Sequence, residues 1–207
     1  MIKILRLNKK INSFNQEINV PGDKSISIRW VLLASQAKGR SKAYNLLMSE
    51  DVLAAIGSIK KLGIKVRIQK NYCEIFGNGI NGFKYKKNLT IDAKNSGTLG
   101  RLILGLLIKS PNIIKIIGDK SLSKRDFSRV TVPLEKFGVK FSYKRKNKLP
   151  LTILGMQSAK GIKYLENRGS AQCKSSIMFA ALNAAGTTSI KAKKSRNHSE
   201  LLFKYLK

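Results

Sequence analysis

The sequence VPGDKSISIR, residues 20–29, decides how the start of this chain folds. Its Pro-Gly pair interrupts an incoming strand, Ser25 is a residue type that caps helices, and apolar residues follow at helical spacing. A turn that leads into a helix exposes unpaired backbone N–H groups and the positive end of the helix dipole. Lys24 precedes that opening and Arg29 lies one turn inside it. The stretch predicts a site for an anion such as a phosphate, although the same residues also fit an ordinary turn with solvated cations.

Length and composition indicate a soluble globular protein. The chain has 207 residues and 43% hydrophobic content, which is enough for one good core or two small ones. Its longest apolar run, near residues 102–108, is far shorter than the roughly 18 residues that a membrane span needs. The first four residues do not have the layout of a secretion signal. We therefore expect a cytoplasmic protein with no membrane partner.

The cysteines and the histidine argue against a disulfide or metal site, whereas the charged residues leave a polyanionic partner open. Cys73, Cys173 and the single histidine, His198, have neither a disulfide pattern nor metal-ligand spacing, so the sequence predicts no metal and no cofactor. The 41 Lys and Arg residues against 11 Asp and Glu give a net charge of +30, which suggests a polyanionic partner. These cations are scattered and lack aromatic interleaving. A solvated, lysine-rich surface is therefore favoured, and a basic nucleic-acid-binding protein remains the alternative.

Periodicity and turn residues predict a repeated series of elements. Two strands, at residues 1–7 and 16–20, come first. The first unit has a helix at 25–36, a strand at 41–45, a helix opened at 49–51 and ended by Gly63, and strands at 64–69 and 72–76. The second has a strand at 89–93, a helix capped at 95–96, a strand at 113–117, a helix at 128–137 closed by Gly138, and strands at 139–143 and 151–154.

A third copy begins with a strand at 162–165. It continues with a helix capped by Gly169–Ser170, a strand at 188–191 and a helix from about residue 197 to residue 207. The two closing strands of the earlier copies do not follow, so we expect a chain cut off inside its third repeat. In each unit the first helix is apolar nearly all round and the second has one apolar stripe. This pattern predicts β-α-β-α-β-β units that pack around a common helical core, with the positive ends of the inner helices near one another.

Four motifs resemble the signatures of one enzyme family, the EPSP synthases (3-phosphoshikimate 1-carboxyvinyltransferases). They are P-G-D-K-S-I-S-x-R from Pro21, N-S-G-T-x-x-R from Asn95, G-D-K-S-L-S-K-R from Gly118, and S-A-Q-C-K-S from Ser170. The segment S-R-N-H-S-E from Ser195 is similar to a fifth. The match is in order and is spread over nearly the whole chain. Asp126 and Phe127 depart from the usual proline and its neighbour, and an acid there could compete for the cation of Arg125.

The resemblance implies binding roles for particular residues. Those expected to hold shikimate 3-phosphate are Lys24, Ser25, Arg29, Ser170, Ala171, Gln172 and Arg196. Those expected to hold phosphoenolpyruvate are Lys24, Gly97, Arg125 and Gln172. The implied catalytic base and acid have no counterpart here and are expected in a C-terminal half. His198 could be a general base, but a cap or packing role is favoured.

The resemblance also implies a fold, an activity and a domain division. The fold is α/β, an inside-out α/β barrel of the enolpyruvyl transferase type. The activity is transfer of a carboxyvinyl group from phosphoenolpyruvate to the 5-hydroxyl of shikimate 3-phosphate, in the shikimate pathway of aromatic amino acid biosynthesis. Residues 1–20 would belong to the other domain, and residues 21–207 would form a substrate-binding domain with units at about 21–80, 88–156 and 160–207.

This chain would then be the N-terminal half of a transferase, inactive alone and monomeric when joined to its missing C-terminal domain. UDP-N-acetylglucosamine enolpyruvyl transferase has the same fold and is the nearest alternative. That family carries a reactive cysteine in the loop corresponding to residues 118–125, where this chain has none.

Overall fold

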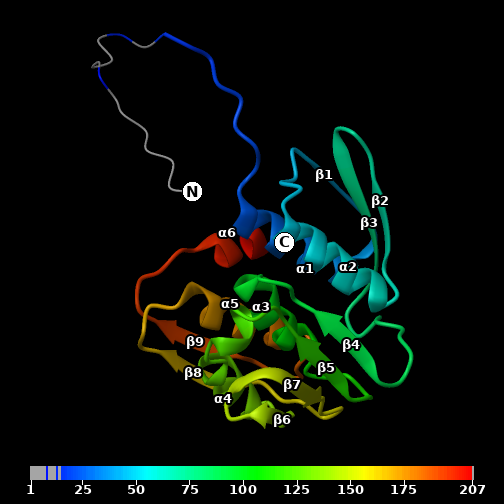
Figure 1. Cartoon of the computed structure of the whole chain (residues 1–207). Coiled ribbons are helices and arrows are strands. Elements are labelled where there is room, and N and C mark those ends of the chain that lie inside the picture. The colour runs from blue at the N-terminus through cyan, green and yellow to red at the C-terminus, as the bar shows by residue number, and fades with distance from the viewer. Residues whose placement is uncertain (1–7, 9–12, 14, 207) are drawn as a thin grey trace.

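Three helices occupy the middle of the molecule and three β-sheets lie around them (Figure 1). The structure is a computed structural model that describes residues 8, 13 and 15–206. The helices are α1 (Lys24–Gln36), α2 (Glu50–Lys61), α3 (Gly97–Leu106), α4 (Ser128–Glu135), α5 (Ala171–Ala181) and α6 (His198–Tyr205), with a 3-10 turn η1 (Leu122–Lys124). The strands are β1 (Lys38–Tyr44), β2 (Lys65–Ile68), β3 (Tyr72–Asn78), β4 (Leu89–Asp92), β5 (Ile114–Ile117), β6 (Lys140–Arg145), β7 (Lys148–Leu154), β8 (Lys163–Glu166) and β9 (Ser189–Ala192).

The sheets share one pattern of connections. Their strand orders are β1-β3-β2, β4-β5-β7-β6 and β8-β9. The strand that follows an inner helix pairs antiparallel with a later hairpin strand in the first two sheets, as β1 does with β3 and β5 with β7. The strand that precedes an inner helix pairs parallel with the strand after it, as β4 does with β5 and β8 with β9. This arrangement confirms the expected α/β class, and the division into three repeating units stays a prediction.

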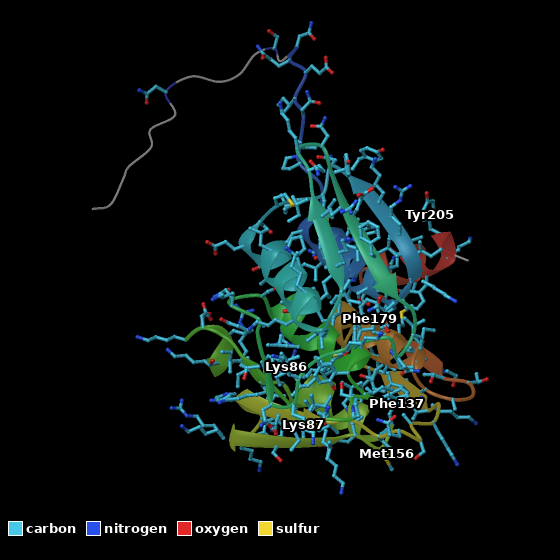
Figure 2. The ribbon with its side chains drawn as sticks, turned by 90° about the vertical axis from the view of Figure 1, so that its right-hand side faces the viewer. Lys86, Lys87, Phe137, Met156, Phe179 and Tyr205 are labelled. Carbon is cyan, nitrogen blue, oxygen red and sulfur yellow. The ribbon has the colours of Figure 1, made fainter. Side chains whose placement is uncertain are left out.

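Burial separates inner helices from outer ones. Helix α1 is buried over most of its length from Ser27 onward, and α3 over eight of its ten residues, whereas α2 buries one stripe. In α5, Phe179 is fully buried and its ring centroid lies 5.9 Å from that of Phe203 on α6. Figure 2 shows Phe179 inside the molecule. It shows Tyr205, which lies on the outer helix α6, at the edge of the molecule. The apolar sides of the helices and the inner faces of the sheets therefore form one core.

Helices α3 and α5 approach each other closely because Gly105 has no side chain. A Cβ atom at this position would lie 2.1 Å from the carbonyl oxygen of Ser176 on α5. Ser176 also donates a hydrogen bond from its Oγ to the carbonyl of Arg101, at 3.0 Å. These contacts fix the position of α3 along the axis of α5, and they therefore also fix the relative position of the two N-terminal ends.

The structure corrects two expectations about the start of the chain. Ser25 was expected to cap the first helix, but the Oδ1 of Asp23 accepts the backbone N–H of Ile26 at 2.7 Å, and Ser25 lies inside the first turn. Both residue types cap helices, but only Asp23 has the extended backbone of a capping residue. The strand expected at 16–20 is absent, because no described strand pairs with this segment. The strand expected at 1–7 lies outside the described residues.

The other expected elements are present, with ends that shift by a few residues. Gly63 and Gly138 follow helices α2 and α4 with φ values of +85° and +94°, which glycine adopts without strain. None of the described helices is both long enough and apolar enough to cross a bilayer.

We predict that Gly105→Ala lowers the free energy of unfolding by about 1–3 kcal/mol, because the added methyl group must push α3 away from α5. Gly57→Ala is the matched control, since Gly57 lies in α2 and a Cβ there meets no atom within 4 Å. That control should be neutral or more stable by up to about 1 kcal/mol, from helix propensity alone. Urea denaturation followed by circular dichroism measures both. Equal stability of the two variants would contradict the close packing described above.

Candidate functional site

A pocket of about 380 Å³ opens at the N-terminal ends of α3 and α5. We call it the arginine pocket. Its lining residues are Arg101, Arg125, Asp126, Arg129, Ser170, Gln172 and Cys173. Three guanidinium groups and one carboxylate therefore face one small volume. Such a surplus of positive charge fits a doubly charged anion, since guanidinium binds phosphate and carboxylate through paired hydrogen bonds.

Gln172 joins the two helix ends across this pocket. Its Oε1 accepts a hydrogen bond from Nη1 of Arg101 at 3.0 Å, and its Nε2 donates to the Oγ1 of Thr98 at 3.1 Å. Gln172 belongs to the first turn of α5, while Thr98 and Arg101 belong to the first two turns of α3. The side chain is thus held at both polar ends. This bridge places the start of α5 beside the start of α3, as the capping pattern predicts.

Gly97 leaves room for two guanidinium groups at the start of α3. A Cβ atom at Gly97 would lie 2.9 Å from Nη1 of Arg101 and 3.0 Å from Nη1 of Arg125. The helix also has a side-chain cap, because the Oγ of Ser96 accepts the N–H of Leu99 at 3.2 Å. The absence of a side chain at Gly97 therefore lets both arginines lie against the positive end of α3. The structure thus brings together three residues that are expected to hold phosphoenolpyruvate, namely Gly97, Arg125 and Gln172.

Arg101 is the most enclosed of the three arginines, and its sequence motif did not mark it as a site residue. Burial lowers its pKa, and the nearby charges of Arg125 and Arg129 lower it further. Its guanidinium lies 5.2 Å from the ring centre of Phe127, which is fully buried. Arg125 and Arg129 are therefore close enough to Arg101 for their charges to repel its own. An anion among them would relieve that repulsion.

Arg125 is carried by a short loop that Asp119 holds in place. The Oδ1 of Asp119 accepts the backbone N–H of Leu122 at 2.7 Å, and its Oδ2 accepts Nδ2 of Asn95 at 2.5 Å. The bond from the Leu122 amide, and then the bond from Asn95, lower the pKa of Asp119 below that of an ordinary aspartate. Because Asn95 precedes α3 and Leu122 opens η1, this carboxylate ties the Arg125 loop to the pocket wall.

Asp126, the departure from the family pattern, does not compete for Arg125. Its Oδ1 accepts the backbone N–H of Ser128 at 2.6 Å and also the Ser128 hydroxyl. The hydroxyl bond is the main cause of its lowered pKa. No ion pair joins Asp126 to Arg125 in the part of the chain that the structure describes. Asp126 thus orders the start of α4, and Arg125 keeps an exposed guanidinium.

Lys24 and Arg29 were expected to meet at the opening of α1, and the structure gives their cations different partners. Lys24 Nζ lies 2.9 Å from Oδ2 of Asp51 and is about half exposed. Arg29 is only 3% exposed. It donates to the Oγ of Ser199 at 2.8 Å, to the Oγ of Ser175 at 3.1 Å and to the carbonyl of Ser25 at 3.0 Å. Neither cation lines the arginine pocket.

The contacts of Arg29 nevertheless bring α1 next to α5 and α6. Burial lowers its pKa, which the charges of Glu200 and Asp23 partly restore, and Arg196 is near enough to lower it slightly. Arg196 itself is exposed, in the loop before α6. His198 is the first residue of α6, and its Nδ1 has no hydrogen-bond partner among the described residues.

Ser170 and Ala171 lie at the start of α5, where the sequence places them. The Oγ of Ser170 accepts the N–H of Cys173 at 3.3 Å and so caps the helix. The carbonyl of Ala171 accepts the hydroxyl of Ser175 at 2.6 Å. Behind them lies Glu166, a buried carboxylate that sequence reasoning missed, because a lone glutamate at a strand end has no motif around it.

Comparison with known proteins was consistent across sequence and structure. The sequence model for EPSP synthase (3-phosphoshikimate 1-carboxyvinyltransferase) matches residues 8–207. The 3-phosphoshikimate 1-carboxyvinyltransferase of Streptococcus mutans is 40% identical over 202 residues, which are 97% of this chain and 47% of that protein. The Streptococcus suis protein of the same name is 41% identical over 198 residues, 95% of this chain and 46% of that protein.

A solved structure of EPSP synthase from Acinetobacter baumannii is similar in three dimensions. It has a TM-score of 0.85 and 34% sequence identity, over 90% of this chain and 42% of the other. The chain thus spans about half the length of the curated relatives it matches.

Asp119→Asn tests how the Arg125 loop is held. Since the folded pKa of Asp119 lies below the unfolded value of about 3.9, its ionised form stabilises the fold above that pH, and the contribution is lost as pH falls through the folded pKa. We expect Asp119→Asn to be less stable than wild type at pH 6 and to converge with it as the pH falls through the folded pKa of Asp119. Urea denaturation at stepped pH measures this, with Glu17→Gln as a control for charge. A gap between the curves that stays constant with pH would show that the carboxylate charge is not involved.

Proposed function

The chain belongs to the EPSP synthase family, and from this membership we propose that it forms the half of such an enzyme that holds both substrates. The reaction transfers a carboxyvinyl group from phosphoenolpyruvate to the 5-hydroxyl of shikimate 3-phosphate and releases phosphate. The observation that carries the proposal is the arginine pocket, in which three guanidinium groups surround the helix ends that Gln172 joins. Two phosphorylated carboxylic acids are the kind of ligand that such a charge surplus suits.

The phosphoenolpyruvate end of the proposed site is Gly97, Arg125 and Gln172. Arg125 is exposed and lies beside Gly97, and Gln172 spans the gap to α3. Arg101 and Arg129 complete the ring of positive charge, although neither was predicted from the sequence. We expect the two exposed arginines to bind the phosphate and the carboxylate of phosphoenolpyruvate, and Arg101 to keep Gln172 in place.

The shikimate 3-phosphate end is proposed to run from Ser170, Ala171 and Gln172 towards α1 and α6. Lys24, Ser25, Arg29 and Arg196 are the residues expected there. Arg29 supports this direction because it connects the first turn of α1 with Ser175 on α5. Arg196 lies within electrostatic range of it. Lys24 would exchange its exposed ion pair with Asp51 for a substrate anion, a change that costs little because surface ion pairs are weak.

The chemistry needs groups that this pocket does not supply. Addition and elimination require a base for the attacking hydroxyl and an acid for the methylene carbon of phosphoenolpyruvate. Asp126 is the one carboxylate among the described residues that line the pocket, and it accepts hydrogen bonds from Ser128. We therefore propose that a second domain supplies base and acid, and that closure of the two domains excludes water.

The edge of β9 offers a place where a further segment of chain could join this domain. Strands β1 and β5 each pair antiparallel with a hairpin strand, whereas β9 pairs with β8 alone in the described part of the chain. A hollow of about 750 Å³ lies beside β9, between α5 and α6, with apolar residues such as Met178 and Phe203 in its wall. A hairpin from a further segment could add to that edge as β3 and β7 do to theirs.

Arg125→Ala should weaken phosphoenolpyruvate binding by tenfold or more, because a hydrogen bond to a charged group contributes about 1.5–3 kcal/mol. Arg145→Ala is the control, since it also removes one exposed arginine but lies in the β6–β7 hairpin. Isothermal titration calorimetry of the 207-residue chain at low salt measures both affinities. An equal loss in the two variants would show that net charge attracts the ligand without any role for the pocket.

A chimaera tests the activity itself. Residues 8–207 replace the matching segment of the Streptococcus mutans relative, and phosphate release is followed with both substrates present. We expect turnover in the chimaera, none from the 207-residue chain alone, and a loss of at least a hundredfold in the chimaera that carries Arg125→Ala. A chimaera that melts cooperatively and yet releases no phosphate would contradict the proposed function.

A further inference from the structure

The last residue of strand β8, Glu166, holds the loop that leads into α5. Its side chain is 2% exposed, so the carboxylate is removed from water. The Oε1 atom accepts the backbone N–H of Arg168 at 3.1 Å, and the Oε2 atom accepts the backbone N–H of Ser170 at 2.9 Å. Each oxygen thus binds a different amide of the same loop. A buried carboxylate needs such partners, because an unpaired one would be strongly destabilising.

The loop that these two bonds close has one defined shape. It contains Gly169, whose φ of +68° is the left-handed conformation that glycine adopts readily. The backbone carbonyl of Glu166 accepts the N–H of Lys193 at 2.9 Å, which anchors the residue to the segment after β9. Glu166 therefore links the sheet on one side to the first residues of α5 on the other.

The position of this loop decides where the pocket residues lie. Ser170 caps α5, and Gln172 follows it by two residues and reaches Arg101 and Thr98 on α3. A movement of the Ser170 amide would turn the first turn of α5 and lengthen the bonds of Gln172. Glu166 does not line the arginine pocket, so its influence passes through the backbone.

We propose that Glu166 is a positioning residue for the shikimate 3-phosphate end of the site. It holds Ser170, Ala171 and Gln172 in register with Arg101 without touching the substrate. This inference rests on the proposed function. A carboxylate is required because the loop presents two N–H donors. Glutamine offers one acceptor oxygen and turns its own NH₂ towards the second donor, and aspartate is too short by one methylene to reach both.

Glu166→Gln in the 207-residue chain tests the proposal. Isothermal titration calorimetry should show an affinity for shikimate 3-phosphate that is five- to twentyfold lower than in wild type. Glu74→Gln is the matched control, because Glu74 is also buried and its Oε1 pairs with Arg40 at 3.5 Å, on β3 and β1. The two variants change net charge equally, so a general electrostatic effect would move both. The control should stay within twofold of wild type.

Amide hydrogen exchange of the ligand-free protein supplies a readout that overall stability does not move. In Glu166→Gln the amides of Arg168 and Ser170 should exchange at least tenfold faster, while those in the middle of α3 keep their wild-type rates. Unchanged exchange at Ser170, or wild-type affinity in the variant, overturns the positioning role. A wild-type chain that does not bind shikimate 3-phosphate overturns the proposed function instead, and the exchange data separate the two failures.

Discussion

The close contact between α3 and α5 is the constraint on which the site depends. Gly105 lets the helices approach until a methyl group would collide with the Ser176 carbonyl, and this contact leaves the two N-terminal ends level with each other. Only then can one side chain, Gln172, reach both Arg101 and Thr98. Each helix end contributes positive potential as well as side chains, so their alignment concentrates charge in one place. The packing of apolar surfaces thus creates the electrostatics of the pocket.

Helix α1 joins this arrangement through a buried arginine, which explains why Arg29 is not open to solvent. A guanidinium that is removed from water needs acceptors, and Arg29 finds them in Ser25, Ser175 and Ser199, on three different helices. Burial lowers its pKa, and Glu200 offsets part of that effect. The result is a polar link between the inner helices α1 and α5 and the outer helix α6. Such a link specifies which faces of the helices meet, because a shifted packing would leave the charge without partners.

Much of this fold could be predicted from local sequence, and the limits have physical reasons. Capping residues and helical spacing located the helices, and glycines such as Gly63 marked their ends. Asp23 and Ser25 are both capping types, however, and the backbone conformation that chooses between them is not visible in the residue types. The roles of Arg101, Arg129 and Glu166 depend on contacts between segments distant in the chain. The sequence shows where these residues lie along the chain, but tertiary packing determines which residues they contact.

The acidic residues around the pocket share one task, which is to hold backbone. Asp119 accepts a hydrogen bond from a backbone amide of the Arg125 loop, and Asp126 accepts one from the amide of Ser128, the first residue of α4. Glu166 accepts hydrogen bonds from two backbone amides that precede α5. None of these three carboxylates forms an ion pair with a guanidinium group in the part of the chain that the structure describes. The arginines keep their charge for a ligand while the loops that carry them stay ordered. This chain has 41 basic residues and only 11 acidic ones. The positions at which its few carboxylates bind therefore matter more to the site than the number of cations around it.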